Sequence, residues 1–170
     1  MYSLAFSILF VSILVLTLLV RFWLASRQIR HVLANRARVP PEFAEKIALA
    51  AHQKAADYTV ARTKFGLLTL LVESAVLVGF TLLGGLQWLA LHLQELTGPG
   101  MVYQIGLIVA FVAISGLIDL PFDYYRQFVL EQRFGFNTMR RSLFFIDMLK
   151  AMALRAVIRL PLLSVVLALM

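Results

Sequence analysis

One segment of the chain reads Asp119-Leu-Pro-Phe-Asp-Tyr-Tyr-Arg-Gln-Phe-Val-Leu-Glu-Gln-Arg-Phe-Gly-Phe-Asn137. It follows residues 101–118, which contain no charged side chain, and it changes abruptly to aromatic residues interleaved with charges. This change is typical of the end of a membrane helix, because aromatic and charged side chains favour the membrane–water interface. The segment therefore indicates a place where a helical membrane protein leaves the hydrocarbon core.

The composition of the whole chain indicates several such helices. Apolar residues make up 61% of the 170 residues, whereas soluble proteins contain about 45–50%. A membrane span needs about 20 mostly apolar residues, and lipid requires such a span to be helical. We expect an all-α, polytopic membrane protein with about four membrane helices and cytoplasmic amphipathic helices between them. The expected spans cover about residues 1–24, 66–91, 101–120 and, incompletely, 151–170; the cytoplasmic segments cover 25–65 and 121–150.

The distribution of positive charge predicts the orientation in the membrane. The formal net charge is +7, and all 16 Lys and Arg residues fall within residues 21–64 and 126–159. Cytoplasmic loops carry the excess of Lys and Arg. We therefore expect both basic blocks in the cytoplasm and the N-terminus outside, together with the turn over residues 91–103. This pattern favours contact with the lipid bilayer and disfavours a nucleic-acid partner, and the short loops suggest a bacterial inner membrane.

Proline and glycine residues predict where helices begin and end. Pro40-Pro41 should end one helix and start an amphipathic helix that runs into the second span. Pro121 should begin a new helical segment where the third span ends, so Asp119 is expected at a helix end on the membrane surface. Gly135 is a candidate left-handed C-cap, and Asn137 or Thr138 could cap the next helix.

Few polar residues lie within the expected spans. Glu73 is the most informative, since an ionisable group inside a span is costly and is usually functional or paired. A structural or wall-lining role, an interfacial position and direct chemistry all remain open for it. Arg155 and Arg159 are four residues apart and share one helix face. They could extend to lipid headgroups, or pair with Glu73, Asp119 or groups outside this sequence.

The sequence offers no catalytic or metal-ligating residue. The three histidines are His31, His52 and His92, and none is followed by Glu. A two-histidine catalytic zinc site also needs a carboxylate and an open water position. The chain has no cysteine, which excludes disulfides and thiolate ligands. Surface positions are therefore the expectation for all three histidines, and no cofactor is expected in this chain.

The segment over residues 119–137 resembles the type I CAAX prenyl protease family of integral-membrane zinc metalloproteases. The resemblance is carried by a family pattern whose positions are occupied here by Pro121, Phe122, Tyr125, Phe128, Val129, Glu131, Gly135, Phe136 and Asn137. Three further stretches are similar to the family in the same order: Val39-Pro40-Pro41-Glu42-Phe43, Lys54 to Phe65, and Arg159-Leu-Pro161-Leu. The resemblance covers most of the chain and corresponds to the amino-terminal membrane domain of the family.

The resemblance implies a ring of seven membrane helices around a water-filled chamber, with zinc near the cytoplasmic mouth. It implies cleavage near the C-terminus of membrane-associated, prenylated proteins, with zinc held by a His-Glu-x-x-His motif and a later Glu. That motif occurs nowhere in these 170 residues. We therefore expect this chain alone to be inert, and the natural protein to continue past Met170 into a C-terminal peptidase domain, its principal partner. Glu131 and residues 134–137 are expected to dock that domain.

Two other classes of function remain open at this point. A stand-alone helical scaffold would bind a partner in the membrane without catalysis. A transporter fragment would need several polar residues near the middle of the bilayer, and Glu73 is the only candidate.

Overall fold

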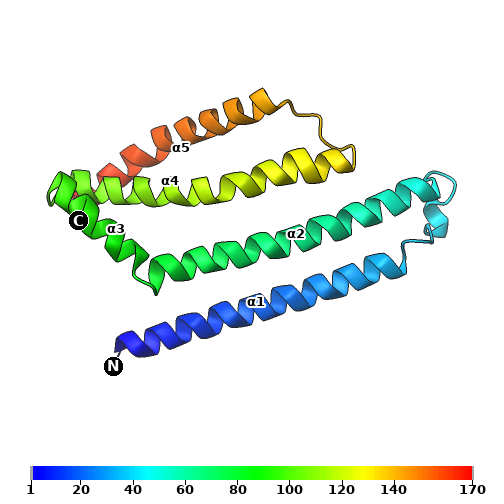
Figure 1. Ribbon diagram of the computed structural model, residues 1–170, viewed down its shortest axis with the longest axis horizontal. Helices are drawn as coiled ribbons and strands as arrows, with labels where there is room; N and C mark the ends of the chain where they lie inside the picture. The colour runs from blue at the N-terminus through cyan, green and yellow to red at the C-terminus, as the bar shows by residue number, and fades with distance from the viewer. Residues whose placement is uncertain (1, 170) are drawn as a thin grey trace. The chain divides into compact units, whose positions relative to one another are not determined.

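The computed structural model describes the backbone of residues 2–169, and their side chains except those of residues 2, 3, 155, 156, 159, 160 and 162–169. The described residues form helices and no strand, which confirms the all-α prediction (Figure 1). The α-helices are α1 (Tyr2–Ala34), α2 (Leu49–Thr81), α3 (Gly85–Thr97), α4 (Met101–Tyr125) and α5 (Arg141–Leu169). A 3-10 helix, η1 (Pro41–Phe43), precedes α2, and a π-helix, η2 (Arg126–Glu131), follows α4.

The chain divides into two compact units, residues 1–77 and 78–170, and α2 crosses the boundary between them. The first unit is a pair of antiparallel helices, α1 and most of α2, joined by residues 35–48 (Figure 1). Ala25 on α1 and Ala56 on α2 are buried. Small residues such as these let two membrane helices approach closely, since lipid itself gives the helices little hydrophobic drive to associate.

The connection between α1 and α2 differs from the prediction. α1 ends at Ala34, and the two prolines start only a 3-10 turn, in which Phe43 N donates to Pro40 O over 2.9 Å. A proline disfavours the α conformation in the residue before it and cannot donate a backbone hydrogen bond. The prediction that Pro40-Pro41 starts the amphipathic helix was wrong, because α2 begins at Leu49.

The second predicted span, residues 66–91, is two helices in the structure. α2 ends at Thr81, and α3 begins at Gly85 after Gly84, whose φ of +79° lies in the left-handed region. A Cβ atom on Gly85 would lie 2.8 Å from Gly79 O, so the backbone is too close at this break between the helices to leave room for a side chain. With 13 residues, α3 is about 20 Å long, too short to cross a bilayer of about 30 Å.

The prediction that a new helical segment begins at Pro121 was wrong. α4 continues through this proline to Tyr125, although Pro121 has no N–H to donate to the preceding turn. The irregular stretch comes later, as η2. In the part of the chain that is described, three helices are long and apolar enough to cross a membrane: Leu4–Ala34, Leu49–Thr81 and Met101–Glu131.

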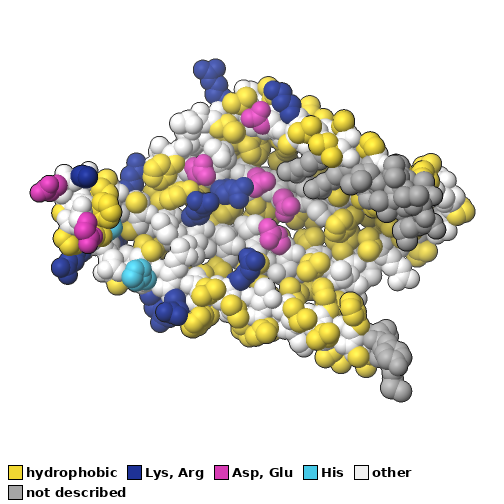
Figure 2. Space-filling view, turned by 180° about the vertical axis from the view of Figure 1, so that it is seen from behind, with side chains coloured by type: hydrophobic (Ala, Val, Ile, Leu, Met, Phe, Trp, Pro, Cys, Tyr) yellow, Lys and Arg dark blue, Asp and Glu magenta, His cyan; other side chains and the backbone are white. Residues whose placement is uncertain are grey.

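The described side chains form almost no core of their own. The buried residues are Ala25, Ala56, Ser74, Leu89, Phe128 and Leu130, and no described side chain is less than 2% exposed. Hydrophobic side chains cover much of the face shown in Figure 2, and acidic and basic groups lie at its left, where the connection between α1 and α2 lies, and in its middle. A surface this apolar belongs against lipid or other helices.

The crowding at Gly85 gives a first testable prediction. Gly85→Ala places a methyl group against the Gly79 and Phe80 backbone, and overpacking of this kind costs about 1–3 kcal/mol. The matched control is Gly79→Ala, which meets no heavy atom within 4 Å and should be neutral or stabilising by up to about 1 kcal/mol. Thermal unfolding in detergent measures both, and an unchanged transition for Gly85→Ala would contradict the close approach of Gly85 to the Gly79 backbone.

Candidate functional site

The segment after α4 forms a corner that we call the α4–α5 corner, residues 124–145. It begins with η2, in which Phe128 and Leu130 are each only 7% exposed. The wider π-helical turn shifts the register of the side chains that follow it, and π-helical segments occur frequently at functional sites. The corner is therefore the first candidate for a functional surface in the second unit.

Gly135 ends the helix at this corner. Its φ is +69°, its N–H donates to Gln132 O over 3.0 Å, and the N–H of Phe136 donates to Glu131 O over 2.9 Å. These two bonds are those of a Schellman motif, which closes a helix with a left-handed glycine. The prediction of a C-cap at Gly135 is confirmed.

The Asn137 side chain accepts hydrogen bonds within the corner, whereas the sequence predicted it as a candidate N-cap of the next helix. Its Oδ1 accepts hydrogen bonds from Met139 N over 2.8 Å and from Gln127 Nε2 over 2.9 Å. The bond to Met139 makes a local side-chain turn, and the bond to Gln127 joins the loop to η2. Asn137 is not the N-cap of α5, because that helix begins at Arg141 and its first turn is closed by Arg140 O.

Aromatic rings fill the angle between α4 and α5. Phe144 makes edge contacts with Phe128 and Tyr124, with ring centroids 5.4 Å and 6.1 Å apart, and the Tyr124 and Phe128 rings are 4.8 Å apart. Edge-to-face pairs such as these add about 0.5–1.5 kcal/mol beyond the area that they bury. Tyr124 and Phe128 therefore pack within the corner, and sequence reasoning missed their partner Phe144.

Other motif residues remain at the surface of the corner. The exposed fractions of Tyr125 and Phe136 are 46% and 49%, and Glu131 is half-buried. Among the described residues, the Glu131 carboxylate takes part in no hydrogen bond or ion pair. The motif thus contains residues that build the corner, such as Phe128 and Asn137, and residues that leave a mixed apolar and acidic surface.

The first unit holds a second candidate at the junction of α1 and α2. Arg36 donates from Nε and Nη2 to the two carboxylate oxygens of Asp57, over 2.7 Å and 2.8 Å. The hydrogen bonds to this carboxylate raise the pKa of Arg36 above its ordinary value. The pair is solvent-exposed, so its contribution to stability is small and its main effect is to fix geometry.

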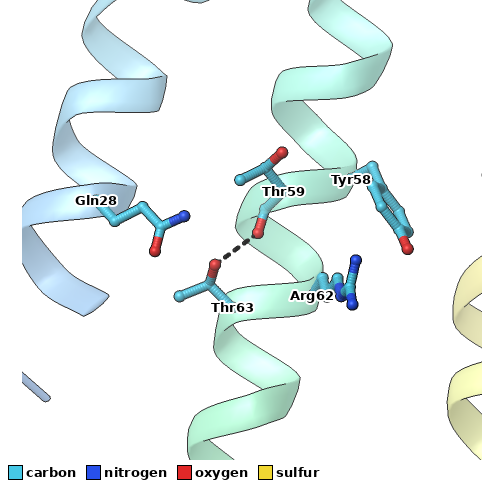
Figure 3. A pocket seen from close by; sticks show the side chains of 5 residues that line it. All are labelled: Gln28, Tyr58, Thr59, Arg62 and Thr63. Carbon is cyan, nitrogen blue, oxygen red and sulfur yellow. Dashed lines mark hydrogen bonds between the residues drawn. The ribbon is translucent and has the colours of Figure 1, made fainter. Parts of the chain in front are cut away.

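Two open cavities lie between α1 and α2. The larger, of about 600 Å³, is lined by residues that include His31, Arg38 and His52. In the smaller, of about 340 Å³, Gln28 points toward Thr59 and Thr63 of α2 (Figure 3). Both cavities are shallow and open, and they do not resemble enclosed substrate pockets.

The described residues do not fit a zinc site. His31 and His52 line the same cavity, but His52 Nε2 lies 3.0 Å from Asn35 O, and Asp57 is occupied by Arg36. His92 is elsewhere, on α3, where its Nδ1 lies 2.9 Å from Trp88 O. Among the described side chains, no three His, Asp or Glu residues converge on a point where a metal could bind.

The remaining polar candidates lie on α2, α4 and α5. Glu73 is exposed on α2, within the first unit, and Asp119 is exposed on α4. No ion pair involves either carboxylate among the described residues. Arg155 and Arg159 lie on α5, but their side chains are outside those that the structure describes.

Comparison with known proteins assigns the family. Residues 28–170 match the family described as CAAX prenyl protease N-terminal, five membrane helices. The chain belongs to this family. It is 34% identical over 152 residues to CAAX prenyl protease 1 homolog of Dictyostelium discoideum, covering 84% of this chain and 34% of that protein. It is 29% identical over 139 residues to CAAX prenyl protease 1 of Saccharomyces cerevisiae, covering 76% of this chain and 31% of that protein.

A solved structure supports the fold. The crystal structure of S. mikatae Ste24p superposes with a TM-score of 0.76 at 24% sequence identity, over 91% of this chain and 37% of that one. This CAAX prenyl protease N-terminal domain is therefore a helical membrane protein, as the sequence predicted. The chain spans about a third of the length of the curated relatives named above, 34% and 31%.

Asn137 gives a second testable prediction. Asn137→Ala leaves the donors of Gln127 and Met139 without their acceptor, which should destabilise the corner by about 1–2 kcal/mol. Asn137→Asp keeps an oxygen in the same place and should cost less. Hydrogen exchange over residues 134–140 measures the local opening; equal exchange in the two variants would contradict the role of Oδ1.

Proposed function

We propose that the chain forms part of the chamber wall and the substrate access path of a membrane zinc metalloendopeptidase. The substrates would be membrane-associated peptides, prenylated peptides among them. The observation that carries the proposal is the family match over residues 28–170, together with three helices that can cross a membrane. The names of the relatives, which are CAAX prenyl proteases, supply the reaction.

Catalysis belongs to another part of the natural protein in this proposal. The described residues of the chain do not fit a zinc site, and the sequence contains no His-Glu-x-x-His motif. The zinc, its ligands and the general base would come from a C-terminal peptidase domain, with which this chain would assemble. The chain would supply the surface that a membrane-bound peptide meets before cleavage.

The proposed orientation follows from charge. Residues 35–48 and 134–140 connect helices within the basic blocks, whereas residues 98–100 connect α3 and α4 where the sequence has no Lys or Arg. The first two connections would lie in the cytoplasm and the third outside. A bacterial inner membrane stays a prediction from loop length, and the relatives named above are eukaryotic.

In this proposal Glu73 lines the chamber, and the α4–α5 corner docks the peptidase domain. An exposed carboxylate on a membrane helix needs water or a polar partner, so Glu73 would line the chamber, with Asp119, Arg155 and Arg159 as further wall or structural residues. At the corner, Glu131 and residues 134–137 would dock the peptidase domain. The half-buried acid beside the exposed Phe136 ring supports this, since such a surface suits a partner with both apolar and basic groups.

A chimaera tests the proposed function. The part of the Dictyostelium relative that matches this chain is replaced by the chain, and cleavage of a prenylated peptide is measured in membranes. We expect activity within about tenfold of the unaltered relative, because the shared fold should position the catalytic part in the same way. A chimaera that inserts into the membrane and cleaves nothing would contradict the proposal and favour the alternative, a non-catalytic scaffold.

The same chimaera tests the docking role in a second arm. Glu131→Ala with Phe136→Ala should lower cleavage at least tenfold without lowering the amount of protein in the membrane. The matched control is Glu95→Ala with Leu96→Ala, which removes an acid and an exposed apolar side chain from α3. Equal activity in the two double variants would refute docking through the corner and leave the family role intact.

A further inference from the structure

The amino-terminal part of the chain carries an unusual charge pattern. Arg21, Arg27, Arg30, Arg36 and Arg38 fall within 18 residues that contain no lysine, and no acidic residue precedes Glu42. Arginine differs from lysine in presenting a planar fork of N–H donors that matches the oxygens of a phosphate or carboxylate. Partners for these guanidinium groups must therefore come from outside this part of the sequence.

The structure supplies a carboxylate to one of them. Arg36 pairs with Asp57, and the only other ion pair among the described residues joins Asp123 and Arg126. Arg27 and Arg30 are exposed on α1 and form no ion pair in the described part of the chain. Their guanidinium groups keep donors that are available to an anion.

Arg30 lies on the side of α1 that faces away from α2, and Arg27 lies at the edge of that side, one helical turn before His31, which lines a cavity with α2 residues. Ala25 and Val32 lie on the α2 side, since Ala25 is buried and Val32 lines the cavity with α2 residues. Trp23 is two residues before Ala25 and Arg30 is two residues before Val32, which places them about 160° around the helix from those residues. Arg27 is one helical turn from both Trp23 and Arg30. Trp23 is 55% exposed. We call these three residues the arginine face.

The depth of the arginine face fits the headgroup region of a bilayer. Residues 1–20 carry no charge and, as a helix, extend about 30 Å, the thickness of the hydrocarbon core. Arg21 is the first charged residue, so Trp23 to Arg30 lie just beyond the hydrocarbon. Tryptophan at this depth is typical of the membrane–water interface.

The contacts within the arginine face orient its cations. The Arg27 guanidinium carbon lies 4.9 Å from the centre of the Trp23 ring, within the range of a cation–π contact. Arg30 Nε donates to Ser26 O over 3.3 Å, which leaves its two terminal nitrogens unused. Both groups are held near the helix by contacts that do not neutralise their charge.

We propose that the arginine face binds the phosphate of an anionic phospholipid headgroup. The proposal accounts for three observations: Arg27 and Arg30 form no ion pair among the described residues, this part of the sequence uses arginine, and residues 1–20 carry no charge. The binding site is independent of the proposed protease function, and a scaffold with the same helix would have it too.

Quenching of Trp23 by brominated lipids tests the proposal. The chain has two tryptophans, so a Trp88→Phe background leaves Trp23 as the only reporter. We expect brominated phosphatidylglycerol to quench Trp23 more than brominated phosphatidylcholine at the same mole fraction. Arg27→Gln with Arg30→Gln should lower the affinity for phosphatidylglycerol relative to phosphatidylcholine, which the quenching reports, by about fivefold for each charge removed, about 25-fold in total. Equal quenching by the two lipids in the unaltered arginine face would overturn the proposal.

Two controls distinguish a headgroup site from general charge attraction and from a free-phosphate site. Arg140→Gln with Arg141→Gln removes the same charge from exposed positions of the second unit and should leave the preference at Trp23 unchanged. A similar loss in that variant would mean general charge attraction and would overturn the site.

Inorganic phosphate should weaken the preference no more than sodium chloride of the same ionic strength, and a stronger effect would identify a free-phosphate site instead. Quenching by phosphatidylcholine shows that each variant remains inserted.

Discussion

The backbone hydrogen bond is the constraint on which the rest of this structure depends. In lipid, every N–H and C=O group must be satisfied within its own segment, so the chain crosses the membrane only as helix. Once that condition is met, these helices need little core, and few described side chains are buried. The specific geometry then comes from the places where helices end: the left-handed Gly84 and Gly135, the side chain of Asn137, and the pairing of Arg36 with Asp57.

The sequence predicts the helices well and their interruptions less well. Long apolar runs and the left-handed cap at Gly135 are local signals, and the all-α class and the cap that they predicted were confirmed. The stop at Pro121 was wrong because a proline in a long apolar helix is tolerated in lipid, where neighbouring groups replace the lost bond. Gly79, Gly84 and Gly85 permitted either close helix packing or a bend, and the sequence could not decide between them, because the break depends on how closely Gly85 approaches the Gly79 backbone. Arg36 and Asp57 are 21 residues apart, and no local pattern predicts their pairing.

The apolar helix surfaces and the polar helix ends are suited to different functions. The exposed apolar surfaces are suited to lipid and to further helices, which agrees with a membrane domain that covers about a third of its relatives, 34% and 31%. We propose recognition roles for the polar groups near the helix ends: docking of a peptidase domain at the α4–α5 corner and binding of lipid phosphate at the arginine face. Asn137 and Phe128 make contacts within the corner, and Glu131 with residues 134–137 remains the proposed docking surface.

The side of the membrane on which each helix connection lies is the most direct test of the proposed arrangement. Since the chain contains no cysteine, single substitutions at exposed positions can be labelled without background, using Glu45→Cys, Thr97→Cys and Thr138→Cys with a membrane-impermeant maleimide. We predict that Glu45→Cys and Thr138→Cys react from the cytoplasmic side and Thr97→Cys from the opposite side. Labelling of Thr97→Cys from the same side as Glu45→Cys would contradict the path of α2 across the membrane, and with it the position of the corner beside a cytoplasmic peptidase domain.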